Sequence, residues 1–136
     1  MSILKDRHFV FNFWLLVLIA VLHNAASLFY FYWTLWWFDI LMHFLGGFWI
    51  ASVCLWIFYG NYFRQISRPS RTKLFVFAIL SSIILGLAWE AFELATNIIL
   101  FPEYIPDSAL DMVMDTIGGV FAYFFYVRNY YLNDGQ

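Results

Sequence analysis

The sequence predicts an all-α integral membrane protein in which four transmembrane helices form a single domain, residues 1–136. Three observations support this fold class: an apolar composition, four long apolar runs, and basic residues confined to alternate loops. Of the 136 residues, 64% are hydrophobic and 12% are charged, and the mean hydropathy is +0.75. A soluble domain of this size could not bury so much apolar surface, so lipid must be its main solvent. The sequence has no basic stripe or nucleic-acid-binding motif, and we expect no nucleic-acid partner.

Four apolar runs are each long enough to span a bilayer as a helix, at residues 9–32, 36–59, 74–100 and 108–131. None shows the period-2 alternation of a β-strand, and a helix satisfies its own backbone hydrogen bonds in lipid. The first run follows Lys5 and Arg7, so a signal peptide cleaved near residues 24–27 is an alternative. The run is longer than a usual signal core, which favours its retention as a helix.

The basic residues lie on one side of the four predicted helices. They precede the first helix, occupy the loop between the second and third, and lie near the end of the fourth: Lys5, Arg7, Arg64, Arg68, Arg71, Lys73 and Arg128. The opposite loops contain no Lys or Arg. Because positively charged loops stay on the cytoplasmic side, we expect both termini in the cytoplasm, an N-in/C-in topology.

One nine-residue pattern occurs twice, about half a chain apart. Asp39 to Gly47 reads DILMHFLGG, and Asp111 to Gly119 reads DMVMDTIGG. Both copies have an acid, three apolar residues ending in Met, a second ligand-type side chain and a glycine pair that suits close helix packing. The pattern predicts two parallel-repeat hairpins. Chance similarity between closely packed membrane helices is the alternative.

Six acidic and histidine side chains fall on matching faces of three predicted helices. They are Asp39 and His43 on the second helix, Glu90 and Glu93 on the third, and Asp111 and Asp115 on the fourth. At about 100° per residue, each pair shares one helix face. At ~1.5 Å per residue, most of them lie roughly 10 Å or less below the outer end of their helix, with Glu90 one turn deeper. We therefore expect one intramembrane site that opens to the outer face.

Five carboxylates at membrane depth need compensation, because a charged residue at the bilayer centre costs about 3 kcal/mol even on the mildest scale. Either some acids are protonated in a hydrogen-bonded network, or a bound cation neutralises them. Carboxylates and imidazole on facing helices are typical of metal sites in bundles, so we predict a divalent metal ion bound by Asp39, His43, Asp111 and Asp115. Oxygen ligands suit Mg²⁺, Mn²⁺ or Ca²⁺; His43, with His23 if it joins the site, also permits Zn²⁺.

Three segments resemble those of small bacterial inner-membrane proteins of the YjdF-like type and, more distantly, those of the VanZ-like superfamily. They are Asp39 to Gly47, Trp89 to Glu93, and Asp111 to Gly119. The resemblance implies a multi-pass protein of the bacterial inner (plasma) membrane and supports the helical fold and the acidic site. The chain departs from the VanZ-like pattern in three places. Ile40 stands where that pattern has a basic residue, the Gln and Arg between the Glu and the Asp pair are missing, and Gly118-Gly119 stands where an Asn is expected.

The predicted function is that of a metal-dependent membrane enzyme, a hydrolase or transferase that acts on a lipid or lipid-linked substrate at the outer leaflet. The ion would polarise a phosphoryl or acyl oxygen or activate water, with Glu90 or Glu93 as general base. A cation or proton carrier or channel is the first alternative, since intramembrane acids mark such paths. Against it, few polar residues are expected in the inner halves of the helices: Asn12, Ser81 and Ser82. A non-catalytic protein that binds a membrane partner is the second alternative.

Overall fold

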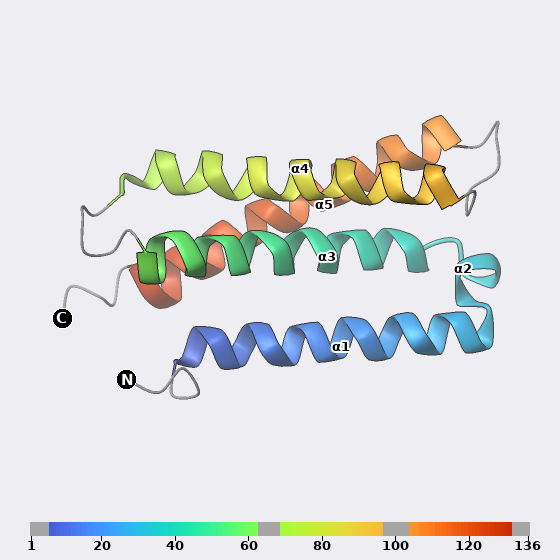
Figure 1. Cartoon of the computed structure of the whole chain (residues 1–136), viewed down its shortest axis with the longest axis horizontal. Coiled ribbons are helices and arrows are strands. Elements are labelled where there is room, and N and C mark those ends of the chain that lie inside the picture. The colour runs from blue at the N-terminus through green and yellow to red at the C-terminus, as the bar shows by residue number, and fades with distance from the viewer. Residues whose placement is uncertain (1–5, 63–68, 97–103, 132–136) are drawn as a thin grey trace.

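The helices of the chain run along roughly one common axis (Figure 1). The structure, a computed structural model, describes residues 6–62, 69–96 and 104–131, and within these ranges there is no strand. The long helices are α1 (Arg7–Phe29), α3 (Phe38–Leu55), α4 (Arg71–Thr96) and α5 (Tyr104–Tyr126). The shorter elements are α2 (Phe31–Thr34) and two π-helical segments, η2 (Trp56–Tyr62) and η3 (Val127–Tyr131), which prolong α3 and α5.

Four segments are long and apolar enough to cross a membrane. They are Arg7–Phe29, Phe38–Gly60, Arg71–Ala95 and Ser108–Asn129. This confirms the prediction of an all-helical chain with four candidate membrane spans.

The turn between the first two spans comes earlier than predicted. The apolar run continues to residue 32, but α1 ends at Phe29 because Tyr30 adopts a left-handed conformation with φ of 59°. The N–H of Tyr30 still bonds to the carbonyl of Ala26, and the chain then forms the separate helix α2. Hydropathy cannot reveal this break, since both sides of it are equally aromatic.

Helices α4 and α5 both begin earlier than predicted, α5 at Tyr104 rather than at residue 108. Helix α4 begins at Arg71 rather than at residue 74, because the helix extends past the apolar run into its basic flank. The last four residues of the third predicted span, 97–100, lie outside the described residues.

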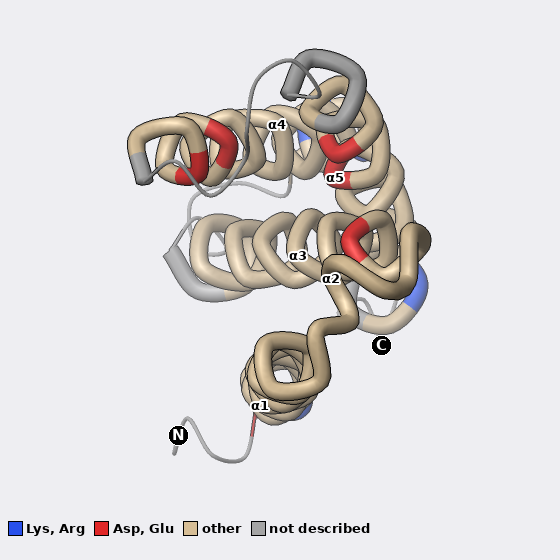
Figure 2. Tube along the Cα trace, turned by 90° about the vertical axis from the view of Figure 1, so that its right-hand side faces the viewer, with Lys and Arg blue, Asp and Glu red and all other residues tan. Residues whose placement is uncertain are grey.

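Helix α3 is the central element. It packs against α1 on one side and against α4 and α5 on the other, and α4 and α5 also pack against each other (Figures 1 and 2). Consecutive long helices run in opposite directions along the bundle. The bundle is thus a three-helix core of α3, α4 and α5, with α1 attached to the outer side of α3.

The two ends of the bundle carry opposite charge. The described Lys and Arg residues lie at the ends of elements that meet on one side, which we call the basic end: Arg7, Arg71, Lys73 and Arg128. The other end, which we call the acidic end, comprises α2, the start of α3, the end of α4 and the start of α5. Figure 2 looks onto this end and shows acidic residues on α3, α4 and α5. The membrane orientation of the two ends and the origin of the two repeats stay predictions.

Small residues allow the three core helices to approach closely. Toward the basic end the core consists of Ala51, Leu55, Leu74, Ala78, Ala122 and Tyr126, all buried. Toward the acidic end, α3 and α5 cross at Gly47 and Gly118: a Cβ atom on Gly47 would overlap the backbone of Asp115, and one on Gly118 would overlap the backbone of Phe44. One glycine of each pair, Gly47 and Gly118, therefore brings the two repeated stretches into direct backbone contact, as expected of membrane helix packing.

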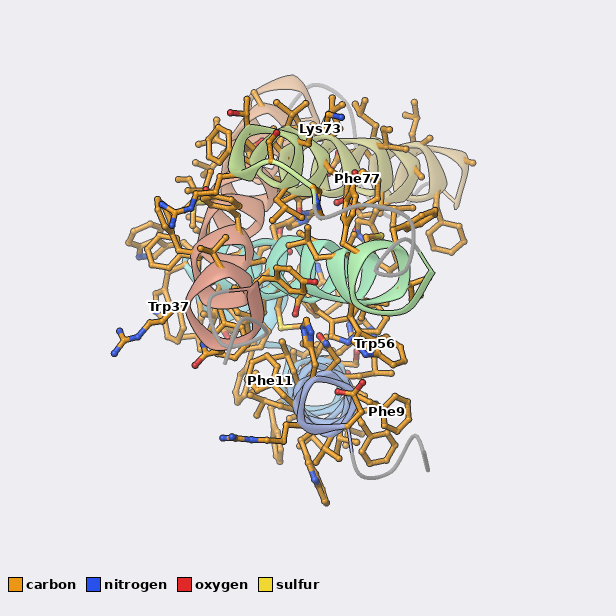
Figure 3. All side chains as sticks on the ribbon, turned by 90° about the vertical axis from the view of Figure 1, so that its left-hand side faces the viewer. Phe9, Phe11, Trp37, Trp56, Lys73 and Phe77 are labelled. Atoms are coloured by element: carbon orange, nitrogen blue, oxygen red, sulfur yellow. The ribbon has the colours of Figure 1, made fainter. Side chains whose placement is uncertain are left out.

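Helix α1 is attached to η2 by aromatic and polar contacts at the basic end. Asp6 caps the helix, with Oδ1 accepting the backbone N–H groups of His8 (2.8 Å) and Phe9 (3.3 Å), and its Oδ2 accepts the indole N–H of Trp56 (2.8 Å). The rings of Phe9 and Trp56 lie 5.5 Å apart (Figure 3). Partial burial alone would raise the pKa of Asp6, but the hydrogen bonds from Trp56, His8 and Phe9 outweigh it and lower that pKa below its usual value near 3.8.

The basic half of the bundle contains more buried polar groups than predicted. His8 is 2% exposed, and its Nε2 lies 3.0 Å from Oγ of Ser52, which is fully buried. Asn12, also buried, donates its side-chain N–H to the carbonyl of His8, and Trp49 donates its indole N–H to the carbonyl of Asn12 (both 3.0 Å). The expectation of few polar residues in this half was therefore wrong: His8 lies before the predicted start of the first helix, and only the packing of α1 on α3 brings it to Ser52.

Candidate functional site

His43 is the centre of a polar cluster at the acidic end. Its side chain is 7% exposed, and carboxylates face both ring nitrogens. Nδ1 lies 3.3 Å from Oδ2 of Asp115, at hydrogen-bonding distance. Nε2 lies 3.7 Å from Oδ2 of Asp111 and 3.9 Å from Oδ1 of Asp39. In this arrangement a carboxylate at one ring nitrogen fixes the orientation of the imidazole, and the other ring nitrogen faces two further carboxylate oxygens.

Local helix geometry explains part of this arrangement. Asp39 precedes His43 by four residues, and such pairs share one face of a helix. Asp39 also lies in the first turn of α3, where a negative charge interacts favourably with the helix dipole. Asp111 and Asp115 have the same spacing on α5.

The glycine contacts account for the cross-helix part. Gly47 lies one turn after His43 and contacts the backbone of Asp115, so the two side chains are brought level. On α4, Gly86 leaves the space that the Asp115 carboxylate occupies, because a Cβ atom at Gly86 would overlap Oδ2. Helices α3 and α4 can therefore pack closely around the Asp115 carboxylate of α5, because Gly47 and Gly86 have no side chains.

Two sets of three side chains have the spacing needed to hold a metal ion, and His43 belongs to both. One set is Asp39, His43 and Asp111; the other is His43, Glu90 and Glu93. Within each set, the candidate ligand atoms all lie within 4.8 Å of one another. The ligands of one divalent cation, at about 2.0–2.6 Å from it, fall in this range of mutual separation.

Glu90 is a buried member of the cluster whose carboxylate lacks hydrogen bonds in the described part of the chain. It is 4% exposed, and neither carboxylate oxygen has a hydrogen-bond partner in the described part of the chain. Burial of an ionised carboxylate without partners costs several kcal/mol in proteins, so such a group is neutral, or a cation is bound beside it.

The described members of the cluster differ in exposure. Asp111 and Asp115 are buried like His43, whereas the side chain of Asp39 is 33% exposed and Glu93 is partly exposed. The described Lys and Arg residues lie at the basic end, so none of them sits at the mouth of the cluster. Any ligand would enter past Asp39 and Glu93.

Tyr32 lies beside this opening, although the sequence pattern gives no reason to include it. Partial burial, followed by the negative charges of Asp39 and Glu93, raises the pKa of Tyr32 to about 12, so its hydroxyl keeps its proton at neutral pH. The hydroxyl lies 2.9 Å from Nδ1 of His23. His23 was a candidate member of the site and instead contacts Tyr32, at an exposed position. The left-handed turn at Tyr30 places Tyr32 here, and no helical spacing rule predicts that turn.

The structure brings together all six side chains that the sequence singled out: Asp39, His43, Glu90, Glu93, Asp111 and Asp115. Their individual roles stay predictions. Asp115 lies on the opposite ring nitrogen of His43 from Asp39 and Asp111, a distinction that the sequence did not suggest.

The fold and the cluster define a helical membrane protein with an acidic and histidine-containing site between its helices. The chain belongs to the family described as "Predicted membrane protein (DUF2238)", which it matches over residues 2–130. No curated protein and no solved structure matches the chain.

Proposed function

We propose that the protein is a metal-dependent membrane enzyme that acts on a lipid or lipid-linked substrate. The observation that carries this proposal is the buried His43 side chain with carboxylates at both ring nitrogens, Asp115 at one and Asp39 and Asp111 at the other. Hydrogen bonding of one imidazole nitrogen to a carboxylate, with the other nitrogen left for the metal, is the usual arrangement of histidine ligands.

In this proposal Asp39, His43 and Asp111 bind the ion, and Asp115 orients the imidazole through Nδ1. This gives Asp115 a different role from the predicted one of direct ligand, because its oxygen lies on the nitrogen that faces away from Asp39 and Asp111. Two carboxylates and one imidazole suit Mn²⁺ or Zn²⁺, and Mg²⁺ or Ca²⁺ fits if water supplies further ligands.

A lipid substrate is supported by where the site opens. Asp39 and Glu93, the partly exposed members of the cluster, lie near the ends of candidate membrane spans, so in the proposed orientation they would face lipid headgroups and not acyl chains. A bound divalent ion would polarise a phosphoryl or acyl oxygen of that headgroup or activate a water molecule. Glu93, which is partly exposed, is the candidate general base, whereas Glu90, the other predicted candidate, is buried and does not reach water or substrate directly.

The charge asymmetry of the bundle supports the proposed orientation. If the basic end lies in the cytoplasm, in accordance with the positive-inside rule, the acidic end faces the outer leaflet of a bacterial inner membrane. The resemblance to YjdF-like and VanZ-like proteins agrees with this location. From that resemblance we carry over the position of the acids and no substrate.

A carrier or channel is the runner-up, and the core packing disfavours it. Below the acidic cluster lies a layer in which Ala51, Ala78 and Ala122 are fully buried and tightly packed. An ion that left the cluster toward the basic end would have to pass through this layer, in which the buried polar side chains Ser52 and Ser82 alternate with the alanines. Cation flux into proteoliposomes that disappears in the Asp39→Asn variant would reverse the ranking of the two functions.

The first experiment measures the divalent metal content of detergent-purified protein by elemental analysis. We expect bound metal in the wild type and its loss in Asp111→Asn, because this change removes one carboxylate charge but keeps the side-chain shape. Asp6→Asn, at the basic end, is the matched control and should retain the metal. A wild type that takes up no metal from a divalent-cation buffer would refute the site.

The enzymatic part needs a separate readout. We expect an unprocessed lipid species to accumulate in cells that contain Glu93→Ala in place of the wild type. Cells that contain Asp115→Ala should accumulate the same species. Identical lipid profiles in wild type and both variants would contradict the lipid-directed activity while leaving the metal site intact.

A further inference from the structure

The two ligand sets are distinct in the described arrangement, and His43 is common to both. Asp39 and Asp111 form one set with His43, and Glu90 and Glu93 form the other, and no set of four or more among the described residues meets the same spacing. Ligands of a single divalent ion lie about 2.0–2.6 Å from it and are correspondingly close to one another. An ion held by Asp39, His43 and Asp111 therefore leaves at least part of the α4 pair uncoordinated.

The burial of Glu90 indicates that the second ligand set has a role of its own. This carboxylate is 4% exposed, lies within 4.8 Å of ligand atoms on His43 and Glu93, and has no hydrogen-bond partner among the described residues. A general base must reach water or substrate, which a carboxylate this deeply buried does not do directly. A cation between Glu90 and Glu93 would supply the missing partner.

We propose that Glu90 and Glu93 bind a second divalent cation beside His43, so that the cluster is a two-metal centre. This inference rests on the proposed function for the first ion, at Asp39, His43 and Asp111. His43 belongs to both sets and so lies between the two ions, with its Nε2 on the first ion and carboxylates as the protein ligands of the second. The charge of two divalent cations also balances that of five carboxylates far more closely than the charge of one does. Such balance matters because uncompensated charge is costly in a low-dielectric environment.

A second ion narrows the substrate class. Pairs of cations about 3.5–4 Å apart are typical of sites that bind phosphoryl groups, because the oxygens of one phosphate can contact both ions. A lipid phosphate that approaches past Asp39 and Glu93 meets one member of each ligand set at the opening. The ligand class that fits this centre is therefore a phosphate-bearing lipid headgroup.

The test uses Mn²⁺ alone as the probe, with full-length protein in detergent. Equilibrium dialysis should give about two bound Mn²⁺ per wild-type chain, as expected for a two-metal site. Glu90→Gln should lower this to about one, since the amide keeps the shape but loses the charge, and Asp6→Asn should leave it unchanged. Electron paramagnetic resonance of the wild type should show a spin-coupled pair, with hyperfine lines at half the spacing of an isolated ion.

The outcomes separate this inference from the proposed function. One Mn²⁺ per wild-type chain with an uncoupled spectrum, lost in Asp111→Asn, would overturn the second ion and leave the first in place. No bound Mn²⁺ in the wild type would overturn both. Two ions that persist in Glu90→Gln would overturn the assignment to α4. The wild-type spectrum decides the question even if Glu90→Gln fails to fold.

Discussion

Two adjacent glycines offer a direct test of how α3 and α5 approach each other. In Gly47→Ala, the new Cβ atom would lie 2.6 Å from the Cα of Asp115 and still closer to its carbonyl oxygen. In Gly46→Ala, the Cβ atom would have no neighbour within 4 Å. The two substitutions are chemically identical and differ by one helix position, so the contrast isolates the interhelical contact.

The size of the effect follows from the distance. Ordinary van der Waals contact begins near 3.4 Å, so the helices must separate by at least about 0.8 Å at Gly47. The obstacle is backbone, which cannot turn aside as a flexible side chain can. Overpacking of this kind typically costs about 1–3 kcal/mol. At Gly46, the helix propensity of alanine is about 1 kcal/mol better than that of glycine, so the change should be neutral or stabilising.

The same separation would disturb the site. The 3.3 Å contact between Nδ1 of His43 and Oδ2 of Asp115 lies one turn from Gly47, and it is already at the long end of the hydrogen-bonding range. We expect Gly47→Ala to weaken divalent-cation binding as well as to lower the melting temperature, and Gly46→Ala to do neither. Cation titration monitored by thermal unfolding in detergent measures both effects. Equal melting temperatures for the two variants would refute the described crossing of α3 and α5.

Three further predictions concern single polar groups. Asp6→Ala should destabilise the protein by about 1–2 kcal/mol at neutral pH, because the helix loses its cap. The folded-state pKa of Asp6 is below 3.8, so the difference in stability between wild type and variant should shrink as the pH of a melting experiment falls below about 4. Ser52→Ala should lower the free energy of unfolding, measured with a chemical denaturant, by about 1–3 kcal/mol, because it removes the hydroxyl that contacts Nε2 of buried His8. Ser52→Thr keeps a hydroxyl and should restore part of this stability. Glu90→Gln should raise the melting temperature of cation-free protein while removing the stabilisation by added Mn²⁺; a metal-free variant less stable than wild type would show that Glu90 has a structural partner.

Much of the candidate site could be predicted because it follows from local periodicity. The four-residue spacing from Asp39 to His43, and from Asp111 to Asp115, places each pair on one helix face whatever the rest of the chain does. The cost of acids in lipid then requires these faces to meet in the interior. Neither argument indicates which carboxylate lies on which nitrogen of His43, since that depends on the rotation of α5 relative to α3.

Other features of the site follow from contacts between segments that no periodicity relates. Tyr32 reaches the opening because Tyr30 breaks the helix, in a stretch where hydropathy does not change. His8 meets Ser52 because α1 packs on α3, and the prediction of a nearly apolar basic half failed for that reason.

The sequence by itself determined that the chain is helical and has four segments able to cross a membrane, because lipid as a solvent requires long apolar runs with internally satisfied backbones. It also determined which acids share a helix face, because the α-helical repeat is local. Only the tertiary structure decided that Glu90 is buried without a partner, that His43 belongs to two ligand sets, and that Asp115 lies on the far nitrogen. These features depend on the distance and angle at which α3, α4 and α5 cross. Close contacts at Gly47 and Gly118 allow the approach of α3 to α5, and those at Gly86 and Gly119 allow the approach of α4 to α5.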